Sequence, residues 1–354
     1  MNIIDKITDK LFRKQWHVGL AKVDIADIIL KQSYPIDYKW LPIKTADRFY
    51  ADPFVFKSPE GQIHVIYEDF SVDDLYGKIS LTIVDDQLKP VFTKEMLDTK
   101  SHLSYPNVFI ENGKTYIIPE ASKSGNVTCY EFDFDTKSLI NGKTIVQNLP
   151  LLDSTILVHN NKYWLFATKR GENSNSKLYI YHSNELAGPY IPHAANPVKD
   201  SLNGTRPAGN FIKLNGNIYR PSQNCAEYYG KSVTINKITV LTENEFEEEV
   251  VREICPPPKS GFNYGIHTIN VVGDVIVIDA LKRMFMPLEQ IQIFLKKIFK
   301  KKKKTVNTST TIIMLYQEFG LLADSLRNFN FYEVFDSVQT YIAITILKSG
   351  FKNL

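Results

Sequence analysis

Residues that could perform chemistry recur at similar intervals along the chain, each group standing just before an apolar run. The groups are Asp52, His102 to Asn107, Asp153, Arg206 to Asn210 and Tyr264 to His267. A second set stands where the following apolar runs end: Glu68, Asp69, Glu120, Lys169, Arg170, Arg220 and Gln223. Carboxylates can transfer protons or attack as nucleophiles, and the arginine fork binds phosphate or carboxylate through two parallel N–H donors. A fold that gathers these groups would form a site of mixed charge.

Each group belongs to a segment that reads as a strand, a tight turn and a second strand. The five segments are DPFVFKSPEGQIHVIYE from Asp52, YPNVFIENGKTYIIPE from Tyr105, DSTILVHNNKYWLFAT from Asp153, AGNFIKLNGNIYRPSQ from Ala208 and GIHTINVVGDVIVIDA from Gly265. Their turn residues Gly61, Gly113, Asn161, Gly216 and Gly273 lie 52, 48, 55 and 57 positions apart. Because glycine and asparagine tolerate positive φ, these turns predict five β-hairpins.

A repeat of this length, with further strand-like runs between the hairpins, is typical of a propeller blade. One four-stranded blade cannot cover its own faces, whereas blades stacked around an axis cover one another. We therefore predict an all-β, five-bladed β-propeller over residues 1–283, closed by a strand at residues 15–23. The first strand of each blade would line the channel, so the chemical groups would meet at one mouth. A β-sandwich with similar hairpins is the alternative.

The composition excludes several classes of function. The chain has 354 residues, 44% of them hydrophobic, and a net charge of +3, which is too small to predict nucleic acid as a partner. Three widely spaced cysteines give neither a disulfide framework nor a zinc motif. The N-terminus lacks the features of a signal peptide, and no apolar stretch is long enough to span a bilayer. We expect a cytoplasmic protein that requires no cofactor.

Residues 284–354 differ in character from the repeats. An apolar stripe at helical spacing runs through residues 288–299, and seven lysines lie between Lys296 and Lys304. A basic amphipathic helix binds anionic membrane surfaces through both burial and charge. We expect a basic, helical C-terminal extension that holds the protein at the inner face of the membrane. A solubilising run and a nucleic-acid patch are the alternatives.

The repeats resemble known carbohydrate-active families. The stretches ADPFVF, NGKTYIIPE, NNKYWLFAT and SNELAGPYIPHAANPV are similar to the five-bladed glycoside hydrolase superfamily that includes family 43. HLSYPNVF, the IPE ending and RPAGNFIKLNGNIYRPSQNCAEYYG are more closely similar to the propeller of plant glucosamine inositolphosphorylceramide transferases. The resemblance covers roughly residues 45–283 and implies a propeller that processes sugars.

The hydrolase resemblance implies roles for two carboxylates and lacks a third. In that family a base begins blade one, a carboxylate that tunes pKa begins blade three, and a general-acid Glu begins blade four. By position Asp52 matches the first and Asp153 the second. No Asp or Glu lies between Ser201 and Ala226, where RPAGN stands instead, which argues against ordinary hydrolysis. His267 resembles a blade-five histidine that faces an axial ion in some members, which implies a structural cation nearby; a core histidine is the alternative.

We predict a glycosyltransferase of surface glycan or glycolipid assembly, which moves a sugar from a phosphate-activated donor to a lipid-linked or saccharide acceptor. Asp52 would be base or nucleophile, and Asp153 and Glu120 would orient sugar hydroxyls. The expected substrate-binding residues are Glu68, Asp69, His102, Tyr105, Asn107, Lys169, Arg206, Asn210, Arg220, Gln223, Tyr229 and His267. Arg206 and Arg220 would stabilise phosphate, which needs electrostatic help more than a general acid. The alternatives are a hydrolase that recruits Glu120 or Glu68 as acid, and a non-catalytic glycan-binding propeller.

Overall fold

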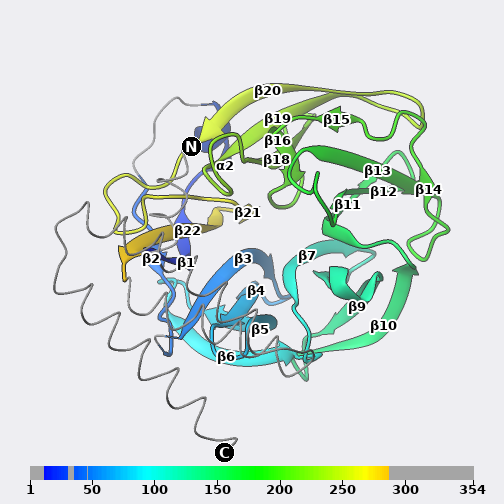
Figure 1. The fold of residues 1–354 in the computed structure, drawn as a ribbon. Coiled ribbons are helices and arrows are strands. Elements are labelled where there is room, and N and C mark those ends of the chain that lie inside the picture. Colours follow the sequence, from blue (N-terminus) through cyan, green and yellow to red (C-terminus); the bar gives the residue numbers. More distant parts are fainter. Residues whose placement is uncertain (1–11, 31–35, 46, 287–354) are drawn as a thin grey trace, which may run out of the picture. The chain divides into compact units, whose positions relative to one another are not determined.

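Five antiparallel sheets surround a central axis in this protein (Figure 1). The computed structural model describes residues 12–30, 36–45 and 47–286, and Gln15–Lys282 form one compact unit that contains the sheets except for the outer ends of β1 and β22. The expected five-bladed β-propeller is therefore confirmed. The lysine-rich segment of the C-terminal extension lies outside the described residues.

The blades follow one another along the chain, each running outward from the axis. Blade one holds β3 (Arg48–Lys57), β4 (Ile63–Ser71), β5 (Tyr76–Val84) and β6 (Pro90–Leu97). Blade two holds β7 (Ser104–Glu111), β8 (Lys114–Glu120), β9 (Val127–Asp133) and β10 (Ser138–Val146). Blade three holds β11 (Leu151–His159), β12 (Lys162–Lys169), β13 (Lys177–Ser183), β14 (Ile191–Pro192) and β15 (Lys199–Asp200). Blade four holds β16 (Asn203–Pro207), β17 (Ile212–Leu214), β18 (Asn217–Asn224), β19 (Ser232–Leu241) and β20 (Phe246–Ile254).

Blade five joins the two ends of the repeat region. Its strand order is β2 (Lys39–Trp40), β1 (Phe12–Lys22), β22 (Val275–Phe285) and β21 (Ile269–Val272), with β21 nearest the axis. The N-terminal strand β1 thus completes a sheet begun by the last hairpin. Closure removes the free sheet edges that an open array would leave at its ends.

The turn residues adopt the left-handed conformations that glycine and asparagine tolerate. Gly61, Gly113, Gly216 and Gly273 have φ values of 86°, 75°, 74° and 60°, and Asn161 has φ 57°. These left-handed conformations are the reason that glycine and asparagine mark the hairpins in the sequence.

The hydrophobic core is divided among the spaces between blades. Five clusters of buried side chains each join one blade to the next, for example Phe54 and Ile79 of blade one with Val108 and Ile117 of blade two. The short helix α2 (Ile25–Leu30) adds buried side chains to the layer between blades four and five. A 3-10 turn, η1 (Ser122–Ser124), follows β8. Among the described helices none is long and apolar enough to cross a bilayer.

Candidate functional site

The inner strands of blades one, two and three share a local distortion at the mouth. In each strand the pairing register slips, between Ala51 and Phe54, between Ser104 and Asn107, and between Leu152 and Thr155. Within these slips Asp52, Tyr105 and Asp153 have φ values of 49°, 39° and 52°. A positive φ is uncommon for residues other than glycine and costs on the order of 1–3 kcal/mol. Three such residues at equivalent places mark this mouth as a functional site.

The distortions bring buried carboxylates from several blades together. Asp52 and Asp153 are 6% and 2% exposed, and Glu68 within β4 and Glu120 at the end of β8 are similarly buried. The backbone N–H of Asp153 donates to Glu120 Oε2 at 3.1 Å. The second strands therefore supply both acids: Glu120 lies at the end of β8 as expected, whereas β4 continues past Glu68 to Ser71.

Burial and mutual repulsion shift the pKa values of these acids. Burial raises the pKa of Asp52 to about 6; the charge of His267 opposes this shift and the charge of Asp153 adds to it. Burial, and then the charge of Asp153, raises the pKa of Glu120 to about 8, while Arg206 opposes. Burial and the neighbouring carboxylates raise the pKa of Glu68 well above its usual value. At neutral pH the cluster therefore combines ionised and protonated carboxyl groups.

Arg206 of β16 brings positive charge into the cluster. Its Nε forms a short contact with Asp153 Oδ2, and its Nη2 donates to Asp153 Oδ1 at 3.3 Å. Its Nη1 donates to Asn175 Oδ1 at 3.1 Å. These contacts occupy three of the five guanidinium N–H groups. The other two have no partner among the described residues and could bind a ligand. Gln223 donates to the same carboxylate at 3.3 Å.

An aromatic side chain covers the arginine. The Tyr229 ring centroid lies 5.3 Å from the Arg206 Cζ atom, and the Tyr229 residue is 40% exposed. An exposed aromatic face beside carboxylates and an arginine can stack against a sugar ring. Tyr229 is thus brought to the cluster as the sequence predicted.

His102 lies next to Glu68. Its Nδ1 accepts the backbone N–H of Gly77 at 3.0 Å and lies 3.6 Å from Glu68 Oε1. Burial and the nearby charges of Lys123, Arg170 and Arg206 lower the pKa of His102 to about 4, so the ring is neutral. Lys123 and Arg170 are exposed and extend the positive charge outward from the mouth. The sequence reading missed Lys123, which follows the Glu120 strand end by three positions.

Three predicted ligand-binding residues tie the blades together at the axis instead. The hydroxyl of Tyr105 accepts the backbone N–H of Gly209 in blade four at 2.7 Å. Asn107 donates to Asn210 Oδ1 at 2.6 Å and accepts the backbone N–H of Ile156 at 3.1 Å. Tyr105 and Asn107 have no exposed surface, so the structure gives them contacts within the protein.

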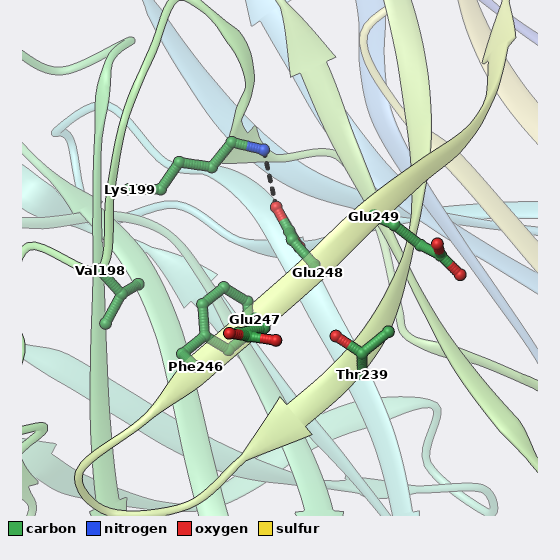
Figure 2. Close-up of a pocket in the computed structure, with 7 residues that line it drawn as sticks. All are labelled: Val198, Lys199, Thr239, Phe246, Glu247, Glu248 and Glu249. Carbon is green, nitrogen blue, oxygen red and sulfur yellow. Dashed lines mark hydrogen bonds and ion pairs between the residues drawn. The ribbon is translucent and has the colours of Figure 1, made fainter.

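Arg220, Asp69 and Lys169 contact partners other than Asp153 and Arg206. Arg220 is 1% exposed and donates to Glu248 at 2.6 and 2.8 Å as well as to two backbone carbonyls. Glu248 also accepts from Lys199 at 2.7 Å, and both line a groove beside β20 (Figure 2). Asp69 pairs with Arg48 at 2.8 Å. The ammonium of Lys169 lies 4.0 Å from the Tyr179 ring centroid.

Comparison with known proteins decides the family. The model of the N-terminal part of glucosamine inositolphosphorylceramide transferase 1 matches residues 41–265. The chain belongs to this family. Among curated relatives, glucosamine inositolphosphorylceramide transferase 1 of Oryza sativa subsp. japonica is 31% identical over 221 residues, and that of Arabidopsis thaliana is 32% identical over 227 residues. Each match covers 61% of this chain and 29% of the relative, so the chain spans under a third of these relatives' length.

Solved structures with a similar arrangement include glycoside hydrolases. A GH43 β-xylosidase/α-arabinofuranosidase from a compost microbial metagenome is 13% identical with a TM-score of 0.49, and the match covers 68% of this chain and 84% of that one. An exo-β-1,3-galactanase from Clostridium thermocellum is 11% identical with a TM-score of 0.46, covering 60% and 53%. Likenesses of this size say nothing about a reaction.

The match to the glucosamine inositolphosphorylceramide transferase family covers only part of the site. The match includes Asp52, Asp153 and Arg206, whereas His267 and Asp279 lie beyond residue 265. His267 Nε2 lies 3.4 Å from Asp52 Oδ1, and Asp279 Oδ2 accepts the backbone N–H of Asp52 at 2.9 Å. The sequence reading missed Asp279, although it ends VIVID as Glu68 ends VIYE and Glu120 ends YIIPE. An acid that ends the apolar run of a second strand was the signal that could have found it.

Proposed function

We propose that this chain is a glycosyltransferase that moves a sugar from a phosphate-activated donor to a lipid-linked or saccharide acceptor. The observation that carries the proposal is the pairing of buried carboxylates with Arg206 at the propeller mouth, where the resembling hydrolases begin blade four with an acid. The names of the family members, glucosamine inositolphosphorylceramide transferases, support the same class of reaction. The acceptor of those relatives is a sphingolipid by name, which supports a lipid-linked acceptor here.

Asp52 acts as base or nucleophile in this proposal. With a pKa of about 6 it is ionised at neutral pH and can take up a proton or attack a sugar carbon. Its oxygens accept from the backbone of Tyr105 at 3.2 Å and from the Thr268 hydroxyl at 3.0 Å, which fixes the carboxylate in one orientation. Orientation of this kind lowers the barrier by positioning the reacting groups in advance.

Arg206 binds the phosphate of the donor through its two remaining N–H groups. A phosphate leaving group departs as an anion, so it gains more from fixed positive charge than from a proton donor. Exposed Lys123 and Arg170 add to the attraction of an anionic donor toward the mouth. Asp153 and Glu120 orient sugar hydroxyls, and Tyr229 stacks against the ring.

The proposal includes attachment to the membrane and a cytoplasmic location, which only the sequence supports. The lysines between Lys296 and Lys304 each contribute about 1 kcal/mol near an anionic surface, which would bring the mouth to lipid-linked acceptors. Binding to vesicles with and without anionic lipid tests this part separately from the chemistry.

Transfer is tested by incubating the full chain with nucleotide sugars and lipid-linked or saccharide acceptors, and by following release of the nucleotide. We expect Asp52→Asn to reduce turnover at least about 100-fold, in the range of a lost acid–base group. Arg206→Ala should weaken donor binding. Asp274→Asn, in an exposed turn with a 60% exposed side chain, is the matched control. Full activity of both site variants would remove these assignments.

Hydrolysis with Glu120 as general acid is the second candidate, favoured by one observation. The pKa of Glu120 is about 8, so its carboxyl group holds a proton at neutral pH and could give it to a leaving sugar oxygen. Release of free sugar from aryl glycosides, abolished in Glu120→Gln, would support hydrolysis over transfer. Binding of glycans with no turnover of any substrate would instead identify a non-catalytic propeller.

A further inference from the structure

Acids of one blade hold the distorted inner strand of the next blade at the mouth. Asp279 Oδ2 of blade five accepts the backbone N–H of Asp52 in blade one at 2.9 Å. Glu120 of blade two accepts the backbone N–H of Asp153 in blade three at 3.1 Å. Asp52 and Asp153 are residues at which an inner strand slips in register with positive φ. Because a buried N–H without a partner is costly, these two acids stabilise the slips.

Glu68 has the equivalent position in blade one but accepts no such hydrogen bond. In the register of its blade it stands opposite the residue that precedes the slip, as Glu120 does in blade two. The corresponding N–H in the next blade belongs to Tyr105, and it donates to Asp52 Oδ2 at 3.2 Å. Neither carboxyl oxygen of Glu68 has a hydrogen-bond partner among the residues that the structure describes. Glu68 is therefore available to a ligand.

Packing against a glycine holds the Glu68 side chain in place. A Cβ added at Gly77 would lie 2.3 Å from Glu68 Oε1 and 2.7 Å from Glu68 Cγ, so the carboxyl group fits there because residue 77 has no side chain. The Glu68 side chain is 8% exposed. Buried polar groups are nearly always hydrogen-bonded, and an exception needs an explanation. A ligand that supplies the missing partners is such an explanation.

His102 adds a hydrogen-bond donor beside Glu68. Its Nδ1 accepts the backbone N–H of Gly77 at 3.0 Å, which places the proton of the neutral ring on Nε2. The 3.6 Å between His102 Nδ1 and Glu68 Oε1 is too long for a hydrogen bond. His102 Nε2 has no partner in the described part of the chain, and the side chain is 30% exposed. An unpartnered carboxyl group and an unpartnered N–H thus lie side by side.

Glu68 lies outside the group of residues suited to a cation at the axis. Among the described residues, Asp52, His267 and Asp279 bring their ligand atoms within 4.8 Å of one another. Their types suit the structural cation that the hydrolase resemblance implies, and this group does not include Glu68. The missing partners of Glu68 are therefore sought in another ligand.

We propose that Glu68 binds two neighbouring hydroxyl groups of the sugar, with His102 as an additional donor, and so determines which sugars the mouth accepts. A hydroxyl group both donates and accepts, so a carboxyl group can bind two of them whether or not it carries a proton. Ala51 pairs with Glu68 and precedes Asp52, so a sugar bound by Glu68 lies beside Asp52. The inference rests on the sugar ligand of the proposed function, but requires neither phosphate nor transfer.

The test measures binding of methyl glycosides of common pentoses and hexoses to the full chain, by titration followed in the NMR spectrum of the ligand. Glu68→Met fills similar space without hydrogen bonds and should weaken binding at least about 10-fold, as expected for two lost hydrogen bonds. Glu68→Gln keeps one acceptor and one donor and should bind within about 3-fold of the unaltered protein. Glu249→Met, the same substitution at a side chain that is 59% exposed on β20, is the matched control and should bind as the unaltered protein does.

Monodeoxy derivatives of the tightest-binding glycoside identify the two hydroxyl groups. A derivative that lacks one of them should bind about 5-fold more weakly to the unaltered protein, but no more weakly than its parent to Glu68→Met. His102→Phe keeps an aromatic ring without the N–H and should weaken binding of the parent glycoside about 5-fold.

Equal binding of glycosides to Glu68→Met and to the unaltered protein would overturn the proposal, as would a lack of glycoside binding to the unaltered protein. Glu68→Gln that binds as weakly as Glu68→Met would mean that negative charge binds the ligand, and the assignment to hydroxyl groups would be wrong. If Glu68→Met does not fold, Glu68→Ala takes its place in the same titration. Glycoside binding in the expected pattern without transfer to any acceptor would support this inference and contradict the proposed transferase activity.

Discussion

Arg206 and Asp153 form an ion pair that is almost withdrawn from water, and removing one partner should be costly. The Arg206 side chain is 15% exposed and that of Asp153 is 3% exposed. Loss of one member of a buried pair costs about 3–5 kcal/mol because the other charge stays buried. Gln223 still donates to Asp153, so we expect about 3 kcal/mol for Arg206→Met. In a propeller of this size this corresponds to a Tm lower by about 6–12 °C.

A double-mutant cycle isolates the pair from other effects of the substitutions. Asp153→Asn combined with Arg206→Met removes both charges, so the double variant should be more stable than Arg206→Met alone. We expect a coupling free energy of about 2 kcal/mol from urea unfolding of the four proteins. The matched control is the exposed pair of Lys237 and Glu249, 33% and 59% exposed and 3.7 Å apart, which should give about 0.2–1 kcal/mol.

The result also bears on the use of Arg206 in binding phosphate. Arg206→Lys keeps the charge but loses the fork, so it should preserve more stability than Arg206→Met while weakening binding of a nucleotide sugar. A coupling free energy no larger than that of the control pair would refute the buried pairing. Unchanged nucleotide-sugar binding in Arg206→Lys would mean that Arg206 links blades three and four but does not bind the phosphate.

Three further predictions concern pH and packing. Stability should fall as pH rises from 5 to 9, because folded Asp52 and Glu120, with pKa values of about 6 and 8, keep protons that the unfolded chain releases. Glu120→Gln should make stability depend less on pH and should stabilise the protein by about 1–3 kcal/mol at pH 7.5. Tm values measured over a series of pH values test both. Gly209→Ala should prevent stable folding, since its φ is 133° and a Cβ would lie 2.0 Å from a backbone carbonyl of blade five, while Gly113→Ala, with open space around it, should cost about 1 kcal/mol by urea unfolding. Asn107→Ala should cost about 1–3 kcal/mol by the same assay while ligand binding is retained, because its amide joins blades two, three and four; lost binding at full stability would return Asn107 to the ligand site.

The fold could be predicted from the sequence because each turn is specified by the residues within it. A glycine or asparagine in a tight turn indicates a left-handed backbone conformation, and five such turns at similar spacing give the blade count. The closing strand follows from the same logic, since a ring of hairpins needs a strand from the other end. The starts of the inner strands also follow, which is why Asp52 and Asp153 could be named.

The contacts of individual side chains could not be predicted in the same way. Arg220 ends an apolar run as the other candidates do, but its partner Glu248 stands 28 positions later in the run FEEEVV. That run reads as an exposed acidic strand, and alternation alone does not say which glutamate turns inward. The left-handed conformation of Tyr105 could not be predicted from the sequence either, since bulky residues avoid this conformation. Such features depend on register and on neighbouring blades.

Closure of the ring and formation of the site depend on the same strand. Trp16 lies in β1, is 8% exposed, and stacks on the ring of His267, whose Nε2 lies 3.4 Å from Asp52 Oδ1. Trp16→Ala should cost about 3–5 kcal/mol as a large-to-small core change, and should also release His267. Trp16→Phe keeps an aromatic face for the stack and should cost less stability than Trp16→Ala in urea unfolding. A Trp16→Ala protein that unfolds at the same urea concentration as the unaltered protein would mean that the Trp16–His267 stack contributes nothing to closure of the ring.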